Sequence, residues 1–416
     1  MNFNLKKIDS AKLYSILGQV TTLGMGYLTQ VFLYIILTAR ETFSHFQLTN
    51  FATNLLGLFV GSVIPTLFSA YIINVPEEKR KSELEKLFLP YLGTLLIQTA
   101  IALLFFLGLA ASGQIDSFRL ELFILSSIQV FAFSLMNLFH MYFIGTRNLK
   151  KFFVFYFIYG ILKSSFTLVA AFVYNSSEAI IIAIALAAFL QTGIIMSHLK
   201  FRFRKSAFSV LNPFFSKFSD QLLANLVLFG LLNFSFIAAY FKINQDYGNF
   251  NLLALTQPIG LVPYYLVSSI GNIYLVDFSR GHRSASDIRS IIIKMMGLLV
   301  IFCIGSLIAA GVVFYLFNKE NLVTLLQYVA IIFPSTIAIA ILSVLLSIYQ
   351  GLQKLHKLRW IVLLLIPVYF LISFLNLKVE QVILVAGAAY LTIALAVGLF
   401  STRLLSEKTL WNESKT

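Results

Sequence analysis

The positions of the basic residues constrain this chain more than any other feature of its sequence. Long apolar segments follow one another along its 416 residues, and 24 of the 31 lysines and arginines lie at the two ends or in every second gap between segments. The gaps in between hold only five, which are Arg40, Arg119, Lys242, Lys319 and Lys378. This alternation is the positive-inside pattern of a chain that crosses a bilayer repeatedly. Both ends of the chain are therefore predicted to be cytoplasmic.

The composition favours the same fold class and excludes others. The chain is 59% apolar and 12% charged, whereas soluble domains have about 45–50% and about 25%. A net charge of +14 would favour nucleic-acid binding in a soluble protein, but these basic residues lie in short loops beside apolar segments. Membrane orientation and anionic lipid explain them better, so no nucleic-acid partner is expected. The single cysteine, Cys303, excludes an internal disulfide and a cysteine-cluster metal site.

Twelve apolar segments are predicted to be transmembrane helices, because an open segment in lipid can pair its backbone polar groups only within a helix. Their approximate limits are 13–39, 47–74, 88–112, 120–145, 152–174, 179–198, 219–241, 251–277, 290–317, 322–350, 360–376 and 381–405. The gaps opposite the basic loops are very short, so no extramembrane domain is expected there. The predicted fold class is an all-α polytopic membrane protein of about 12 transmembrane helices.

A weak internal repeat divides the chain into two halves. A shift of 204 residues lays Phe46 on Phe250 and lays the charged stretch 79–84 on 283–288. Six spans in each half predict parallel repeats about an axis along the membrane normal, with any substrate bound between them near mid-bilayer. The predicted domains are an N-terminal lobe, a basic cytoplasmic linker, a C-terminal lobe and a cytoplasmic tail, with limits 1–198, 199–218, 219–405 and 406–416.

Lys163 is a basic residue that membrane topology does not explain. It lies at the centre of the predicted span 152–174, eleven residues from either end. A lysine at that depth costs about 2.5–3.5 kcal/mol on insertion scales, and its side chain cannot easily reach the interface. The functional interpretation is contact with an anion, most naturally a phosphate that enters the bilayer. The structural alternative is pairing with a carboxylate or with backbone carbonyls, and the functional interpretation is preferred because intramembrane charges are functional by default.

Uncharged polar residues occur deep in several other spans. Each alone is better explained by hydrogen bonding between helices, but together they can line a hydrated cleft. Those predicted to contact a substrate beside Lys163 are Gln30, Asn50, Asn54, Gln129, Asn233 and Gln257. Further polar residues of this kind are Asn137, His140, Gln191, Asn225 and Asn272. Pro258 and Pro263, on either side of Gly260, predict a bend in the span 251–277.

Four charged residues near span ends are candidates for gating or ion coupling, and they are Asp220, Asp277, Arg40 and Glu41. The two aspartates lie near cytoplasmic ends, where solvation at the interface or pairing with Lys217 and Arg280 is the simpler interpretation. The other two end the first span on the outer side. An outer gate is one interpretation of that pair, and an exposed ion pair is the simpler one.

Signatures of catalytic sites do not occur in the sequence. There is no Walker lysine loop, no metal-spaced set of histidines and cysteines and no nucleophile elbow. The chain is therefore expected not to be an enzyme, and no catalytic residue, metal or cofactor is expected. Coupling to a proton or sodium gradient is compatible with the sequence.

Two related stretches carry a resemblance to a known group of proteins. The first is NFATNLLGLFVGSVIPTLFSAYI followed by EEKRKSELEKL, and the second is YLVSSIGNIYLVDFSRGHRSASDIRSII. With the chain length, the six-plus-six spans and the inward ends, they make the whole chain resemble the multidrug/oligosaccharidyl-lipid/polysaccharide (MOP) exporter superfamily. Within it the chain looks most like the Wzx-type polysaccharide flippases of bacteria, where a span followed by a short polar helix recurs at this place.

The resemblance implies a MATE-like fold of two six-helix lobes in the bacterial inner membrane. It implies a cargo of oligosaccharide repeat units on undecaprenyl pyrophosphate (O-antigen, enterobacterial-common-antigen-like or capsule units) that moves from the cytoplasmic to the periplasmic leaflet by alternating access. The implied partners are this lipid-linked glycan, membrane lipids and the glycan polymerase machinery. Lys163 fits the cationic central cavity of such flippases, although this sequence offers one deep cation where several are expected.

Two other functions stay as alternatives. A MATE-type drug or cation antiporter belongs to the same superfamily, but that mechanism uses deep carboxylates, and no Asp or Glu lies in the middle of a predicted span. A membrane glycan polymerase or glycosyltransferase would need a large outer loop with acidic residues, and the outer gaps are too short for one.

Overall fold

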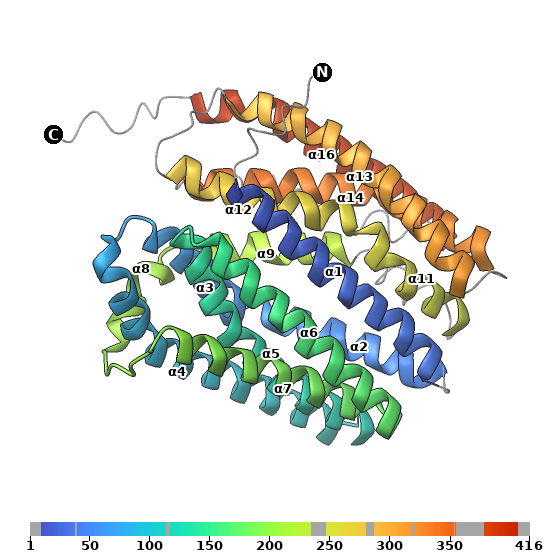
Figure 1. The fold of residues 1–416 in the computed structure, drawn as a ribbon, viewed down its shortest axis with the longest axis horizontal. Coiled ribbons are helices and arrows are strands. Elements are labelled where there is room, and N and C mark those ends of the chain that lie inside the picture. The colour runs from blue at the N-terminus through green and yellow to red at the C-terminus, as the bar shows by residue number, and fades with distance from the viewer. Residues whose placement is uncertain are drawn as a thin grey trace. The chain divides into compact units, whose positions relative to one another are not determined.

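The computed structural model describes residues 10–37, 40–113, 117–233, 247–279, 287–317, 321–352, 354 and 378–406. Within these ranges all regular elements are helices (Figure 1). The predicted all-α fold is therefore confirmed.

Eight helical stretches in this part of the chain are long and apolar enough to cross a membrane. They are Thr53–Ile72, Glu77–Ala111, Leu120–Gly145, Leu149–Tyr174, Ser177–His198, Asp287–Leu316, Leu322–Gly351 and Val379–Leu399. Two shorter apolar stretches, Gly24–Ile36 and Phe218–Leu232, fall in the predicted first and seventh spans. The predicted span 360–376 lies outside the described residues. The chain is a multi-pass membrane protein.

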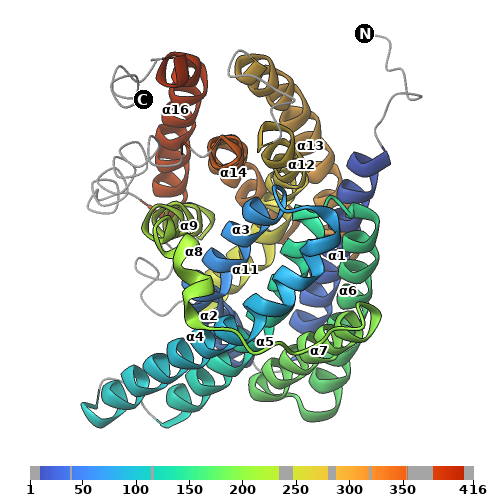
Figure 2. The same cartoon turned by 90° about the vertical axis from the view of Figure 1, so that its left-hand side faces the viewer.

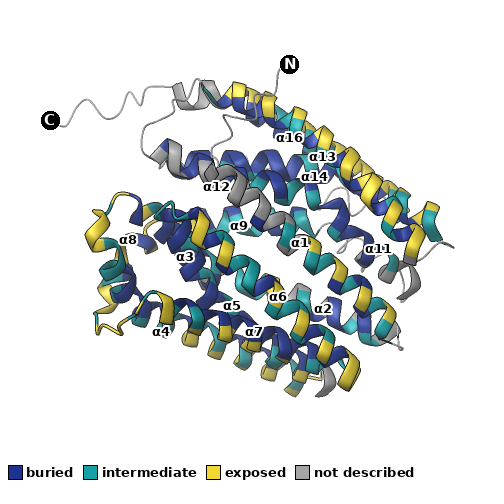
Figure 3. Cartoon of the chain, in the orientation of Figure 1, coloured by how far each residue is buried: buried dark blue, intermediate teal, exposed yellow. Residues whose placement is uncertain are grey.

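The outward faces of the long helices are apolar rather than polar. On α13 (Asp287–Phe317), Ile293, Ile301, Ile304 and Ile308 are all exposed, and Figure 3 shows exposed residues along this side of the helix. A soluble protein would cover such a stripe or replace it with charged residues. These side chains are suited to contact lipid.

The first compact unit comprises Met1–Phe229 and Gln245–Leu255. Its helices are α1 (Ser10–Ile36), α2 (Arg40–Gly57), α3 (Val60–Ile72), α4 (Glu77–Ala111), α5 (Ser117–Gly145), α6 (Leu149–Tyr174), α7 (Ser177–His198), η2 (Phe208–Leu211), α8 (Asn212–Phe215) and most of α9 (Phe218–Leu232). In this unit α5 packs against α2, α3, α4 and α7, and α1 lies along α6 (Figures 1 and 2).

The second unit comprises Gly230–Asn244 and Thr256–Thr416. It contains the end of α11 (Tyr247–Gly260), α12 (Val262–Ser279), α13, α14 (Leu322–Gly351) and α16 (Val379–Ser406). In this unit α14 is central, because it packs against α12, α13 and α16. The limits predicted for the lobes, the linker and the tail stay a prediction.

Two predicted spans are each interrupted near their middle. The span 251–277 divides at Leu261 into α11 and α12, so the helix is interrupted between Pro258 and Pro263, where the sequence predicts a bend. The span 47–74 divides in the same way, because α2 ends at Gly57 and α3 begins at Val60. Interrupted spans at corresponding places in two repeats are typical of membrane transport proteins.

Side chains of neighbouring helices bind the carbonyl groups beside these interruptions. Gln98 Nε2 donates to the carbonyl of Leu56 at 2.7 Å. The carbonyl of Gly61 accepts from Tyr91 Oη at 3.4 Å and from Asn137 Nδ2 at 3.2 Å. Such bonds are required because a backbone carbonyl in lipid has no water to replace its lost partner.

Among the close approaches between helices, one is found at equivalent places in the two units. A Cβ atom added to Gly145 of α5 would lie 2.6 Å from the carbonyl oxygen of Ser69 on α3, and one added to Gly351 of α14 would lie 2.6 Å from that of Leu275 on α12. The two glycines are 206 residues apart, and so are their two partners. The same helix contact is therefore repeated in the two halves, close to the shift of 204 residues found in the sequence.

Replacing Gly145 or Gly351 with alanine should lower the free energy of unfolding by about 2 kcal/mol, because backbone atoms must move apart to admit the methyl group. Thermal unfolding of the purified protein measures this effect. Matched controls are Gly108→Ala in α4 and Gly311→Ala in α13, where an added Cβ meets nothing within 4 Å. These controls should leave the melting temperature unchanged or raise it, since alanine favours a helix over glycine. Equal melting temperatures for all four variants would contradict the repeated close contact.

Candidate functional site

Lys163 lies on the face of α6 that packs into the first unit. Tyr159 and Thr167 lie four residues before and after it, so the three side chains share one helix face. Tyr159 is 4% exposed and Thr167 is 1% exposed, while Lys163 itself has intermediate exposure. Gly160, three residues before the lysine, is also buried. The lysine is therefore part of the interior of this unit and does not lie on a lipid-facing stripe.

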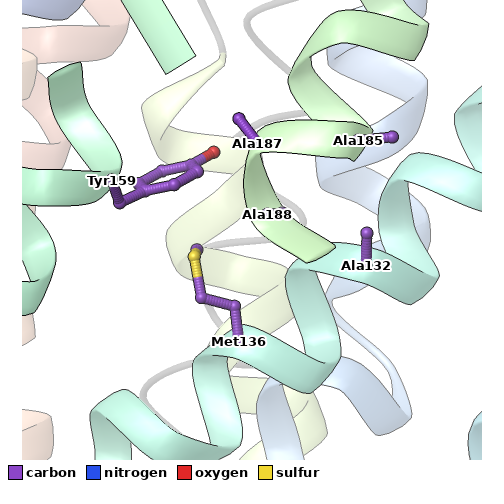
Figure 4. Close-up of a cluster of buried hydrophobic side chains, with 6 residues drawn as sticks. All are labelled: Ala132, Met136, Tyr159, Ala185, Ala187 and Ala188. Carbon is purple, nitrogen blue, oxygen red and sulfur yellow. The ribbon is translucent and has the colours of Figure 1, made fainter. Parts of the chain in front are cut away.

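An apolar cluster lies one helical turn from Lys163. Figure 4 shows the Tyr159 ring near Met136 of α5 and Ala187 of α7, in a cluster that also contains Ala132, Ala185 and Ala188. Phe133 of α5 meets Tyr159 edge to face, with ring centroids 5.8 Å apart. Packing of Tyr159 in this cluster sets the orientation of the α6 face that also bears Lys163.

The helix register places Gln129 of α5 at the depth of Lys163. The two helices run antiparallel, since His140 contacts Tyr156 at a centroid distance of 5.4 Å and Phe133 contacts Tyr159 further along. One more turn along each helix reaches Gln129 and Lys163. Gln129 is 1% exposed, and its Oε1 accepts a hydrogen bond from Thr53 Oγ1 of α2 at 3.4 Å.

Tyr27 and Gln30 of α1 lie near the same depth as Lys163. α1 and α6 lie side by side, and Gly18 of α1 packs on Phe153 of α6 (Figures 1 and 2). Counting nine residues on from Gly18 reaches Tyr27, and counting ten on from Phe153 reaches Lys163. Because parallel helices rise equally per residue, Tyr27 and the next turn with Gln30 lie near the level of the lysine.

The ammonium group of Lys163 has no partner within the described part of the chain. The ion pairs found there are Lys81–Glu85, Lys86–Glu83 and Arg204–Glu85, and no described hydrogen bond reaches Lys163. A carboxylate partner, which was the structural alternative, is therefore not found among the described residues.

Several buried polar atoms near this depth also have no hydrogen-bond partner. They are Tyr27 Oη, Gln30 Oε1, Tyr159 Oη and Thr167 Oγ1. Buried polar groups normally find partners in the protein or in ordered water, so polar atoms of this kind are typical of places that water or a ligand occupies. One cationic group among hydroxyl and amide groups suits an anionic ligand that also carries hydroxyl groups. The described residues contain no group of His, Cys, Asp or Glu that could hold a metal ion.

Not all predicted substrate contacts lie in this group. Asn50 and Asn54 are on α2 of the same unit, with intermediate exposure and exposed respectively. Gln257 and Asn233 belong to the second unit, where Gln257 Nε2 donates to the carbonyl of Leu232 at 2.8 Å and so caps the end of α9. By helix register, Lys163, Gln129 and Gln30 therefore lie at a similar depth in the first unit, and the other four residues stay predicted contacts.

Three of the other deep polar residues bond between helices, as expected for such residues. Asn137 bonds to Gly61, Gln191 Nε2 donates to the carbonyl of Phe155 at 2.7 Å, and Asn225 Nδ2 donates to Ser62 Oγ at 2.7 Å.

The gating candidates have mixed outcomes. Asp220 lies in the first turn of α9 with intermediate exposure. Arg40 and Glu41 were predicted to end the first span, and this prediction was wrong. The helix α1 stops at Ile36, and the two residues begin α2. Asp277 lies in α12, and its side chain, like those of Arg40 and Glu41, is outside the described residues.

Sequence reasoning missed three members of this group. Tyr159 and Thr167 could have been found from their spacing of four residues on either side of Lys163. Tyr27 carries no such signal, because its place depends on how α1 packs against α6.

The sequence matches no protein-family model and no curated protein. Solved structures with a similar fold include a multidrug resistance MATE family transporter of the MOP superfamily in an outward-facing conformation, with a TM-score of 0.68, 12% identity and coverage of 96% of this chain and 97% of that chain. An inward-facing structure of a transporter so described gives a TM-score of 0.61, 13% identity and coverage of 94% and 98%. A MATE transporter of Vibrio cholerae gives a TM-score of 0.63 and 13% identity, with coverage of 96% of this chain and 96% of that chain. The chain therefore has the fold of these MATE transporters, which confirms the predicted fold class.

Proposed function

We propose that this chain is a flippase that moves undecaprenyl-pyrophosphate-linked oligosaccharide from the cytoplasmic to the periplasmic leaflet of a bacterial inner membrane. The observation that carries the proposal is the unpaired ammonium of Lys163 on the packed face of a membrane helix. The fold supports it, since two similar solved structures are described as outward-facing and inward-facing multidrug transporters. A change between outward-facing and inward-facing states would carry a head group across the membrane without opening a continuous pore.

The cost that such a protein must lower is the transfer of a charged, hydroxyl-rich head group through hydrocarbon. Moving an isolated anion into an apolar medium costs on the order of tens of kcal/mol. Lys163 would attract the phosphate groups, and each charge-assisted hydrogen bond contributes about 1.5–3 kcal/mol. Tyr27, Gln30 and Tyr159 would exchange bonds with sugar hydroxyls, while the prenyl chain stays in lipid. No covalent bond changes, so no catalytic residue is required.

A translocation assay in proteoliposomes tests this function. A lipid-linked oligosaccharide is placed in the outer leaflet, and the fraction of sugar open to a membrane-impermeant reagent is followed. With the protein present, about half of the sugar should become protected as the two leaflets equilibrate. Protection no greater than in protein-free liposomes would contradict the proposal.

A drug or cation antiporter is the second candidate, favoured because two of the similar structures are those of multidrug resistance transporters. The charge of Lys163 disfavours it, because two like charges at 4 Å repel by about 4 kcal/mol at an effective dielectric constant of about 20. Expression in an efflux-deficient host distinguishes the two, since a raised drug resistance would support the antiporter.

A further inference from the structure

The segment between α7 and α9, residues 200–217, is bound to the surface of α4 by hydrogen bonds. Glu85 of α4 is 2% exposed and accepts hydrogen bonds from the backbone N–H of Arg202 at 3.1 Å and from Arg204 Nε at 2.9 Å. Ser206 Oγ donates to the carbonyl oxygen of Lys86. The charged part of this segment therefore has a defined position although its backbone is irregular from Phe201 to Ala207.

Aromatic contacts continue the attachment along α4. The ring of Phe201 packs against Phe88, with centroids 5.1 Å apart, and against Phe139 of α5, at 5.5 Å. Further on, the tip of the Phe208 ring lies against Gly93, where an added Cβ would come within 2.8 Å of Phe208 Cζ. The segment thus follows α4 from its charged beginning into its apolar part.

The position of Phe208 along α4 indicates its depth in the membrane. Lys86 is the last charged residue of α4, and Gly93 lies seven residues beyond it. Seven residues of α-helix rise about 10 Å. The neighbouring Leu96 and Ile97 of α4 are exposed, as expected where a helix meets lipid. Phe208 therefore lies at the level of the acyl chains, near their head-group ends, and not at the level of the charged residues.

The outward side of the segment combines exposed aromatic and basic side chains. Phe203, Phe208 and Phe215 are 65%, 56% and 51% exposed, and Arg202 and Lys205 are exposed near them. Residues 200–217 include five lysines and arginines and no acidic residue. An aqueous surface would gain nothing from three exposed phenylalanines, whereas a membrane interface accommodates apolar rings and binds basic groups.

We propose that residues 200–217 form an interfacial anchor that binds anionic phospholipid of the cytoplasmic leaflet. Phe203, Phe208 and Phe215 insert among the acyl chains, and Arg202 and Lys205 bind the phosphate head groups. Arg204 is held by Glu85 and keeps the segment on α4. Because the hydrogen bonds of Glu85 fix this arrangement before lipid binds, the anchor is preorganised. It is independent of the cargo that the chain carries.

Tryptophan fluorescence tests the depth. The chain has two tryptophans, Trp360 and Trp411, which are replaced with phenylalanine, and Phe208→Trp then supplies the only signal. In vesicles, lipid brominated near the head-group end of the acyl chain should quench this tryptophan more strongly than lipid brominated near the chain end. Quenching by aqueous iodide without quenching by either brominated lipid would overturn the proposal and indicate a surface for a cytosolic protein.

The same tryptophan tests the lipid preference. At equal mole fraction, brominated phosphatidylglycerol should quench it about twofold more than brominated phosphatidylcholine, since each basic group near the surface favours anionic lipid. Arg202→Gln with Lys205→Gln should remove this preference. Lys150→Gln with Lys151→Gln is the matched control, because both lysines are exposed and belong to another predicted cytoplasmic loop. Equal quenching by the two lipids in the parent protein, or the same loss in the control, would overturn the anionic preference.

Discussion

Lys163→Ala should lower the rate of lipid-linked oligosaccharide translocation at least tenfold while the protein still folds. The substitution removes the ammonium that we propose contacts the phosphate groups, and a lost charge-assisted hydrogen bond of about 1.5–3 kcal/mol corresponds to a factor of about ten to one hundred. Lys163→Glu should be at least as severe because it places a negative charge there. The measurements are translocation in proteoliposomes and restoration of surface glycan in a deletion strain.

Stability separates this role from a structural one. Because the described residues give Lys163 no ion-pair partner, its charge stabilises no contact there, and alanine at this place should keep or raise the melting temperature. Lys163→Arg should retain part of the activity. Lys151→Ala, at an exposed position of the same helix, is the control and should be fully active. Full activity of Lys163→Ala would contradict the anion contact, and a large loss of stability would indicate a structural lysine.

Glu85→Ala should lower the free energy of unfolding by about 3 kcal/mol. The carboxylate is 2% exposed, and it accepts bonds from Arg202 N and Arg204 Nε. Hydrogen bonds to charged groups contribute about 1.5–3 kcal/mol each, and Glu85→Ala removes two of them. Thermal unfolding in detergent and the protease sensitivity of residues 200–217 would both report the loss.

Glu83→Ala is the matched control for Glu85, since both acids lie near the start of α4, two residues apart. Glu83 pairs with Lys86 at 2.7 Å, but Lys86 is 44% exposed, so solvent screens the pair. Such partly exposed pairs contribute about 1 kcal/mol or less. A melting temperature of Glu85→Ala equal to that of Glu83→Ala would show that Glu85 does not hold the segment.

Most of the membrane helices could be predicted from the sequence because each is a continuous apolar run between charged loops. The limits of α5, α6 and α14 agree with the predicted spans to within three residues. Pro65 predicted a kink in the span 47–74, but the division between α2 and α3 lies before it, between Gly57 and Val60. Helix ends outside the apolar runs were harder to predict, because polar residues such as Arg40 and Glu41 suggest a loop but begin α2 in the structure.

The centre of the candidate site could be predicted, but its surroundings could not. Lys163 stands out because a charge in mid-span is costly, and that cost is visible in one segment. Tyr27 and Gln129 lie near its depth only because α1 and α5 pack beside α6 with particular registers. Register between helices depends on the fit of many side chains, and no local pattern encodes it. For the same reason the sequence could not distinguish Gln257 from Gln129, since both are polar residues deep in a predicted span.

The central claim is that Lys163 contacts the phosphate groups of the cargo. The most direct measurement compares two cargoes in the same proteoliposomes, one oligosaccharide linked through pyrophosphate and one carried on a neutral lipid, for the parent protein and Lys163→Ala. The parent should translocate the pyrophosphate cargo faster than the neutral one, and Lys163→Ala should reduce this preference about tenfold while the rate for the neutral cargo changes little. An unchanged preference in Lys163→Ala would contradict the claim.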